Sequence, residues 1–162
     1  MTDDEDEILA AELGKLGAAG GRMGATVDSL LGLQGNSGAS ARGGAAGARW
    51  AGRRLRKNTD EIEMTLAVPL DETYVRVASL LGALGRVVAQ AGPADGRGVV
   101  RGVLGAGAMN LNPAVVTVTM TSAGQGATML RIRGAAKEGL IKQRTGEKAA
   151  QRVAAHLQKA ET

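Results

Sequence analysis

The reactive side chains of this chain form few of the combinations that catalysis requires. The 162 residues include one histidine, His156, and no cysteine. A nucleophilic triad needs a base, usually histidine, but His156 lies in a predicted helix beside Val153 and Leu157, where we expect a packing role. The absence of cysteine excludes disulfide bonds, thiolate metal sites and cysteine nucleophiles. The sequence therefore favours a protein that is not an enzyme.

Three neighbouring carboxylates are the best candidates for a metal site. Asp60, Glu61 and Glu63 lie where the first strand of the C-terminal region is predicted. Glu61 and Glu63 point the same way along a strand, whereas Asp60 is expected in the linker before it. This pattern favours a solvated strand edge, so we expect no metal ion and no cofactor.

Two glycine-rich stretches approach phosphate-binding motifs without completing them. Residues 134–139 have the glycine spacing of a P-loop, but Leu140 and Ile141 stand where lysine and a hydroxyl residue are required. Residues 105–110 lack the third glycine of the dinucleotide-binding fingerprint. Neither stretch predicts a nucleotide site.

The charged residues are distributed unevenly along the chain. The formal net charge is +4, residues 3–7 are all acidic, and a basic cluster surrounds Trp50. Cations interleaved with an aromatic residue are typical of flexible nucleic-acid arms. The candidate polyanion-binding residues are Arg49, Arg53, Arg54, Arg56, Lys57, Arg131, Arg133, Lys137, Lys142 and Arg144.

Residues 1–57 are predicted to form a flexible, Gly/Ala-rich N-terminal arm. A short acidic amphipathic helix is expected over residues 3–16, because acids in the first turn complement the helix dipole and Gly14 and Gly17 should end it. Apolar residues in such a segment suit a peptide that folds on a partner. The candidate partner-binding residues of the arm are Leu9, Leu13, Leu16, Leu30 and Leu31.

Residues 58–162 are predicted to form an α+β domain. Alternation of apolar and polar residues predicts strands over 61–69, 98–104, 114–122 and 127–134. Apolar residues at helical spacing predict a helix over 72–90, capped by Asp71, and a final helix capped by Thr145. The expected order is therefore βαβββα.

Strands with one apolar and one polar face suit a mostly antiparallel sheet with helices on one face. We therefore expect a small two-layer α+β sandwich. Its alternative is a reduced helix-grip (Bet v 1/START-like) fold, to which the strand-Pro-Leu-Asp-helix opening and the long terminal helix are similar. The polar face is rich in threonine and arginine but lacks the aromatic residues that stack RNA bases. The residues expected on this face are Glu63, Thr65, Thr117, Thr119, Thr121, Arg131 and Arg133.

These patterns predict a non-catalytic binding or interaction domain. Its expected partner is a protein, including a second copy of the chain, or a small apolar ligand. The alternative is a nucleic-acid or polyanion-binding accessory protein that uses the basic arm and the loop near residue 140. The acidic start does not resemble a signal peptide and no run is apolar enough to span a membrane, so we expect a cytoplasmic protein without membrane contact.

Overall fold

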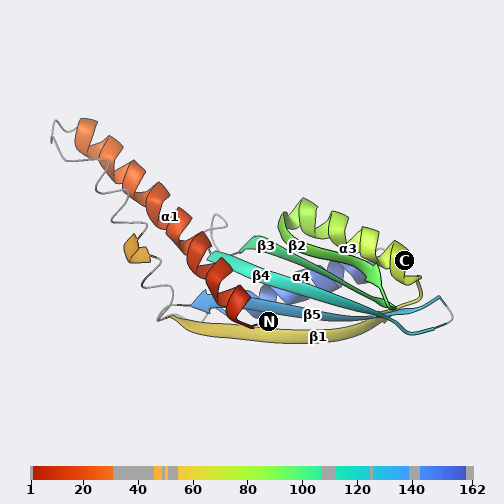
Figure 1. Ribbon diagram of the computed structural model, residues 1–162. Coiled ribbons are helices and arrows are strands. Elements are labelled where there is room, and N and C mark those ends of the chain that lie inside the picture. Colours follow the sequence, from red (N-terminus) through yellow and green to blue (C-terminus); the bar gives the residue numbers. More distant parts are fainter. Residues whose placement is uncertain are drawn as a thin grey trace. The chain divides into compact units, whose positions relative to one another are not determined.

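The computed structural model describes residues 2–30, 46–48, 50, 55–106, 112–124, 126–138 and 143–159 (Figure 1). For residues 2, 3 and 20–30 it describes the backbone. The chain divides into two compact units, Met1–Arg56 and Lys57–Thr162. In the part of the chain that the structure describes, no helix combines the length and the apolar character needed to cross a membrane.

The first unit contains helix α1, which spans Thr2–Leu30. The prediction that this helix ends near Leu16 is wrong, since it continues through Gly14 and Gly17. Each glycine costs a helix only about 1 kcal/mol relative to alanine. Leu13 and Lys15 flank Gly14, and Ala18 and Ala19 follow Gly17. All of these residues have a high helix propensity.

The second unit is built on a five-stranded antiparallel sheet. Along the sheet the strands follow the order β1-β5-β4-β3-β2. The last four strands form a meander, in which each strand pairs with its neighbour in sequence. The strands are β1 (Arg56–Leu66), β2 (Gly85–Ala94), β3 (Arg97–Ala106), β4 (Asn112–Ser122) and β5 (Thr128–Glu138).

Strand β2 corrects the predicted order of elements. The helix expected over residues 72–90 is α3 (Leu70–Leu84), and the chain then turns directly into β2, so the order is βαββββα. Asp95 and Gly96 connect β2 to β3 with φ angles of 51° and 73°, as a two-residue hairpin turn requires. At Gly85, a Cβ atom would lie 2.2 Å from the carbonyl oxygen of Val103, so only glycine fits this close approach.

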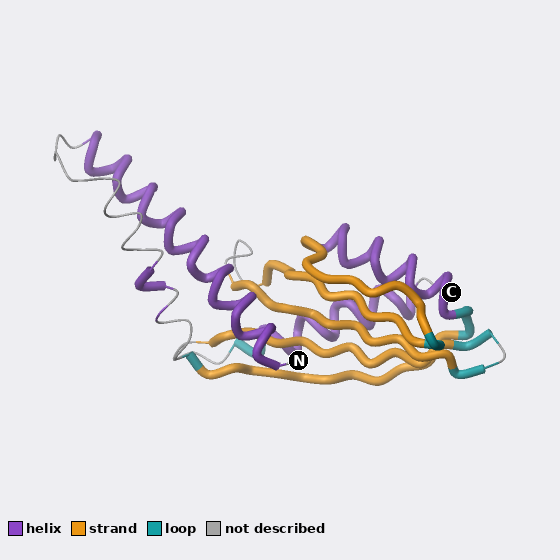
Figure 2. The backbone as a smooth tube through the Cα atoms, in the orientation of Figure 1, coloured by secondary structure: helices purple, strands orange, loops and turns teal. Residues whose placement is uncertain are grey.

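Two helices of the second unit cover one face of the sheet (Figure 2). Helix α3 packs against β2, β3 and β4, while α4 (Thr145–Lys159) packs against β5, β4 and β3. Residues of both helices and of the sheet share one core, which contains Leu81, Met120 and Ile132. The α+β sandwich with an antiparallel sheet is confirmed, and its C-terminal helix held across the sheet matches the helix-grip alternative.

Side chains from helix α3 and strand β5 hold the junctions between elements. The Val68 carbonyl accepts hydrogen bonds from the hydroxyls of Thr73, at 3.3 Å, and Thr128, at 2.8 Å. These bonds fix the passage from β1 to α3 against the start of β5. Thr145 does not precede α4 as a cap, as predicted, but is the first residue of the helix. The backbone N–H of Thr145 donates to the Glu138 carboxylate at 2.6 Å.

Candidate interaction surface of the sheet

The face of the sheet opposite the helices carries the polar residues that alternation predicted. The strand register aligns Val99, Thr119 and Arg131 in one row across β3, β4 and β5. The adjacent row aligns Arg101, Thr117 and Arg133 in the same way. We call this the outer face, and these polar side chains come from three consecutive strands of the sheet.

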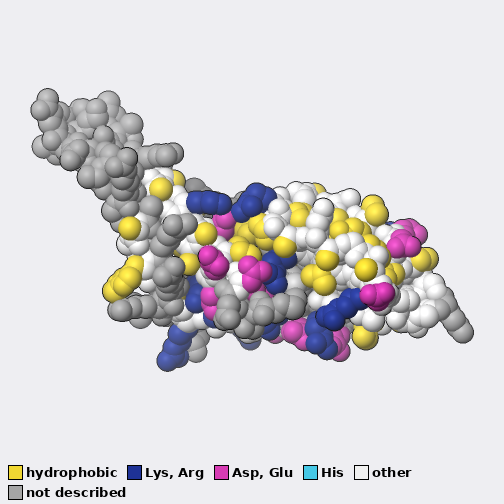
Figure 3. Space-filling model, viewed as in Figure 1, with side chains coloured by type: hydrophobic (Ala, Val, Ile, Leu, Met, Phe, Trp, Pro, Cys, Tyr) yellow, Lys and Arg dark blue, Asp and Glu magenta, His cyan; other side chains and the backbone are white. Residues whose placement is uncertain are grey.

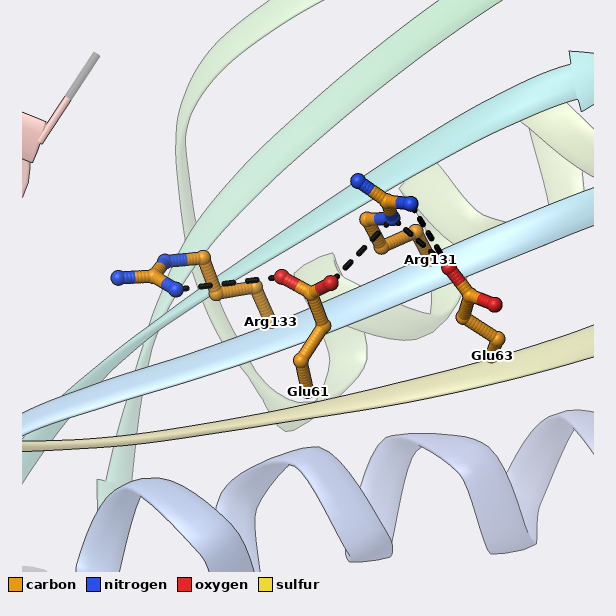
Figure 4. Close-up of polar contacts among 4 residues, drawn as sticks. All are labelled: Glu61, Glu63, Arg131 and Arg133. Atoms are coloured by element: carbon orange, nitrogen blue, oxygen red, sulfur yellow. Dashed lines mark hydrogen bonds and ion pairs between the residues drawn. The ribbon is translucent and has the colours of Figure 1, made fainter.

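Four residues of β1 and β5 form a charged strip on the outer face: Glu61, Glu63, Arg131 and Arg133 (Figure 4). The Arg131 guanidinium donates to Glu63 Oε1 through Nε at 3.1 Å and through Nη2 at 2.8 Å. Arg131 Nε also lies 3.3 Å from Glu61 Oε1, and Arg133 Nη1 lies 3.9 Å from Glu61 Oε2. The strip thus links two strands that are neighbours only in the folded sheet.

The charged strip is electrically balanced. The hydrogen bond to Glu63 and the negative charges of Glu61 and Glu63 raise the pKa of Arg131. Arg131 and Glu63 are more than half exposed, at 57% and 58% of their side chains, so solvent screens the attraction and limits its contribution to stability. Two arginines beside two glutamates give no net charge to attract a polyanion. The space-filling view shows side chains of both charges on the molecule (Figure 3).

A buried pair on the outer face was missed by the sequence analysis. Arg101 Nε donates to Thr117 Oγ1 at 2.9 Å, and both residues are only 4% exposed. Alternation around Val100 places Arg101 on the outer face, so its direction is readable from the sequence. Its burial is not, because an arginine in a half-exposed sheet is expected to reach solvent.

The structure describes six of the ten predicted polyanion-binding residues, and their role in binding stays a prediction. Arg131 and Arg133 belong to the charged strip, and Arg144 Nε lies 2.7 Å from Glu147 Oε2. Arg56 is exposed, whereas Lys57 and Lys137 are partly buried. The remaining predictions lie outside the described residues: Arg49, Arg53, Arg54 and Lys142.

The predicted leucines of the arm fall mostly on α1. Leu9 is fully buried, and Leu13 and Leu16 are partly buried. Their spacing of four and three residues puts them on one face of the helix. Leu30 is the last residue of α1, and its side chain lies outside the description, as does all of Leu31. The role of all five leucines in partner binding stays a prediction.

The side chains considered for catalysis and metal binding are dispersed. His156 is exposed on α4, which corrects the predicted packing role. Asp60 lies within β1 and not in a linker. Within the described ranges, no three His, Asp or Glu residues gather as metal ligands would.

The opposite, inner face of the sheet is closely covered by the helices. A Cβ atom on Gly134 would lie 2.0 Å from the carbonyl oxygen of Gly146 in α4. Under α3, a Cβ atom on Gly98 would lie 3.2 Å from Tyr74 Cδ2, and one on Gly102 would lie 3.4 Å from Leu81 Cβ. Side chains and backbone of the helices therefore occupy the space above all three glycines.

Comparisons with known proteins find similarity only at the level of structure. No family model and no curated protein matches the chain. The Mll3558 protein from Rhizobium loti is 15% identical, with a TM-score of 0.38 over 67% of this chain and 99% of that protein. Ara h 8.0201 is 12% identical, with a TM-score of 0.35 over 65% of this chain and 96% of that one.

A third structure is the Zhui aromatase/cyclase from Streptomyces sp. R1128. It is 14% identical, with a TM-score of 0.30 over 64% of this chain and 86% of that enzyme. Cyclase activity belongs to that protein by its description. At these identities and TM-scores the likenesses carry no argument about the activity of this chain, whose fold is defined by its own topology.

Proposed function

We propose that the chain is a non-catalytic interaction domain that contacts a protein partner. The observation that carries the proposal is the occupied space between sheet and helices at Gly98, Gly102 and Gly134. Ligand sites inside a domain are cavities of a few hundred Å³. A sheet whose glycines are already in contact with helix atoms favours recognition at the surface.

Two surfaces support a protein partner over a polyanion. The charged strip contains two positive and two negative side chains and so carries no net charge, which suits the polar rim of a protein interface. On α1, Leu13 and Leu16 are partly exposed and lie three residues apart on one helix face, and apolar residues at such spacing are the anchors of helix-mediated recognition.

Affinity capture with the full chain tests the proposal. The wild-type chain should retain one protein in near-equal amount from a lysate of its source organism. Leu13→Asp/Leu16→Asp should lose that protein, because carboxylates on the apolar face cannot be buried without a partner. Lys15→Ala, on the same helix but 64% exposed, is the matched control and should retain it.

A small apolar ligand is the outcome that would contradict this function. Native mass spectrometry of the purified full chain separates the two cases. If the partner is a protein, the purified chain should carry no small molecule and should retain the captured protein. A bound apolar molecule of constant mass, together with no captured protein, would show that the interior serves as the binding site.

A further inference from the structure

The exposed side of α4 carries four basic residues in one line: Lys148, Arg152, His156 and Lys159. All four are exposed. Their spacing of four, four and three residues keeps them on one face of an α-helix, over a length of about 16 Å. We call this line the α4 basic stripe, and it contains none of the predicted polyanion-binding residues.

The surroundings of the stripe leave its positive charge uncompensated along the helix. The one acidic residue of α4 is Glu147, which lies in the first turn and forms an ion pair with Arg144. From Lys148 to Lys159 the other exposed residues are Gln151, Ala155 and Gln158, which carry no charge. The stripe therefore differs from the balanced charged strip of the sheet.

We propose that the α4 basic stripe binds the phosphate backbone of a nucleic-acid duplex without regard to sequence. A row of cations on a rigid helix matches a row of phosphates, and lysine and arginine are the residues that neutralise them. Histidine adds a ring N–H donor to the same row. This activity uses a different surface and a different ligand from the protein-partner function, and it does not depend on it.

Two observations select a duplex over other polyanionic surfaces. Helix α4 contains no aromatic residue, whereas single strands are normally held by bases stacked on aromatic side chains. The apolar side of α4, with Ala149, Val153 and Leu157, is buried in the core. The helix therefore has no apolar face to insert into a membrane, as interfacial helices do.

Fluorescence anisotropy with a labelled DNA duplex of mixed sequence tests the stripe. The full chain should bind the duplex in 50 mM salt, more tightly than a single strand of the same length. The substitutions K148Q, R152Q and K159Q together should weaken binding at least about 10-fold and lower the slope of log affinity against log salt by about 3. Glutamine keeps a high helix propensity, and circular dichroism checks that the fold is retained.

The control is a second triple variant with the same loss of charge: K15Q, R86Q and R97Q. These three cations are exposed on α1, β2 and β3, so this variant should retain binding within about 3-fold. Equal losses in both variants would show attraction by net charge alone and would overturn the proposal. Binding that survives the α4 variant but is lost in R53A/R54A/R56A would place the duplex on the basic arm, which also overturns it.

An acidic protein is the remaining outcome. If the chain fails to bind the duplex in 50 mM salt yet binds poly-glutamate through the stripe, the nucleic-acid assignment is wrong. The capture experiment with Leu13→Asp/Leu16→Asp reports on α1 alone, so its result and that of the stripe are independent.

Discussion

The two faces of one sheet are used in opposite ways. On the inner face, glycines let the helices approach until backbone nearly meets backbone, as at Gly134 and Gly146. On the outer face, exposed Arg131 and Glu63 form an ion pair in solvent. Alternate residues of one strand supply the two faces, so neighbouring positions in β5 experience very different physical demands.

The two faces place different constraints on the sequence. Inner-face positions are limited by volume, since interiors are packed as densely as organic crystals and one added methyl group is felt. Exposed outer-face positions such as Arg131 and Glu63 are limited mainly by polarity, because water replaces lost contacts there. Four substitutions test this contrast, and they are given in order of decreasing effect.

The substitution Gly134→Ala should cause the largest loss. Its Cβ would lie 2.0 Å from the Gly146 carbonyl oxygen and 2.9 Å from the carbonyl carbon, so α4 must move away from β5. We expect the free energy of unfolding to fall by about 3 kcal/mol, measured by urea denaturation. A loss below about 0.5 kcal/mol would mean that α4 is loosely held and that the inner face is not tightly packed.

The substitution Thr117→Val tests the buried part of the outer face. It keeps the shape of the side chain but removes the oxygen that accepts the 2.9 Å hydrogen bond from Arg101. Because the donor is charged and buried, we expect a loss of about 2 kcal/mol in urea denaturation. Thr119→Val, two residues along the same strand and partly buried, is the control and should change stability by less than about 0.5 kcal/mol.

The substitution Gly82→Ala should stabilise the protein by up to about 1 kcal/mol, because alanine favours the helix more than glycine does. Gly82 lies inside α3, and a Cβ atom there would meet nothing within 4 Å. Thermal unfolding followed by circular dichroism measures the gain. Stability should therefore fall for Gly134→Ala, where glycine is required for close packing, and rise for Gly82→Ala, where it is not. A decrease in melting temperature for Gly82→Ala would contradict this distinction.

The substitution Glu63→Gln should have the smallest effect. It removes the charge that Arg131 faces and lets the raised pKa of Arg131 return toward its ordinary value. The pair is exposed and screened by salt, so the urea midpoint at 150 mM salt should not move measurably. A clear decrease in the urea midpoint would show that the charged strip contributes to the stability of the fold.

Local patterns predicted the elements whose two faces differ most. Strands β1, β4 and β5 follow from alternation, and α4 follows from its apolar stripe at Ala149, Val153 and Leu157. The pairing of β1 with β5 was not predictable, because pairing between distant strands leaves no local pattern. The charged strip depends on that pairing, so its four residues were identified singly but not as one site.

Strand β2 was missed because its residues continue the helical spacing of α3 as far as Val88. The deciding constraint is the return of the chain to Arg97, the first residue of β3. If the helix reached Gln90, only six residues would remain before Arg97, and they extend at most about 20 Å. They would have to run back along the roughly 30 Å length of β3 to reach its first residue. Asp95-Gly96, a strong signal for a hairpin turn, was present to indicate the strand.

The meander described above also bears on how the domain folds. Strands β2 to β5 close through short connections, which are fast because little chain entropy is lost. Strand β1 must find β5 across a long stretch of chain: the hydrogen bonds from Arg131 to Glu63 in β1 span 68 residues, and the bond from Thr128 to Val68, just after β1, spans 60. We therefore expect the attachment of β1 to complete folding, with the carbonyl of Val68 among the last groups to reach its native bonds.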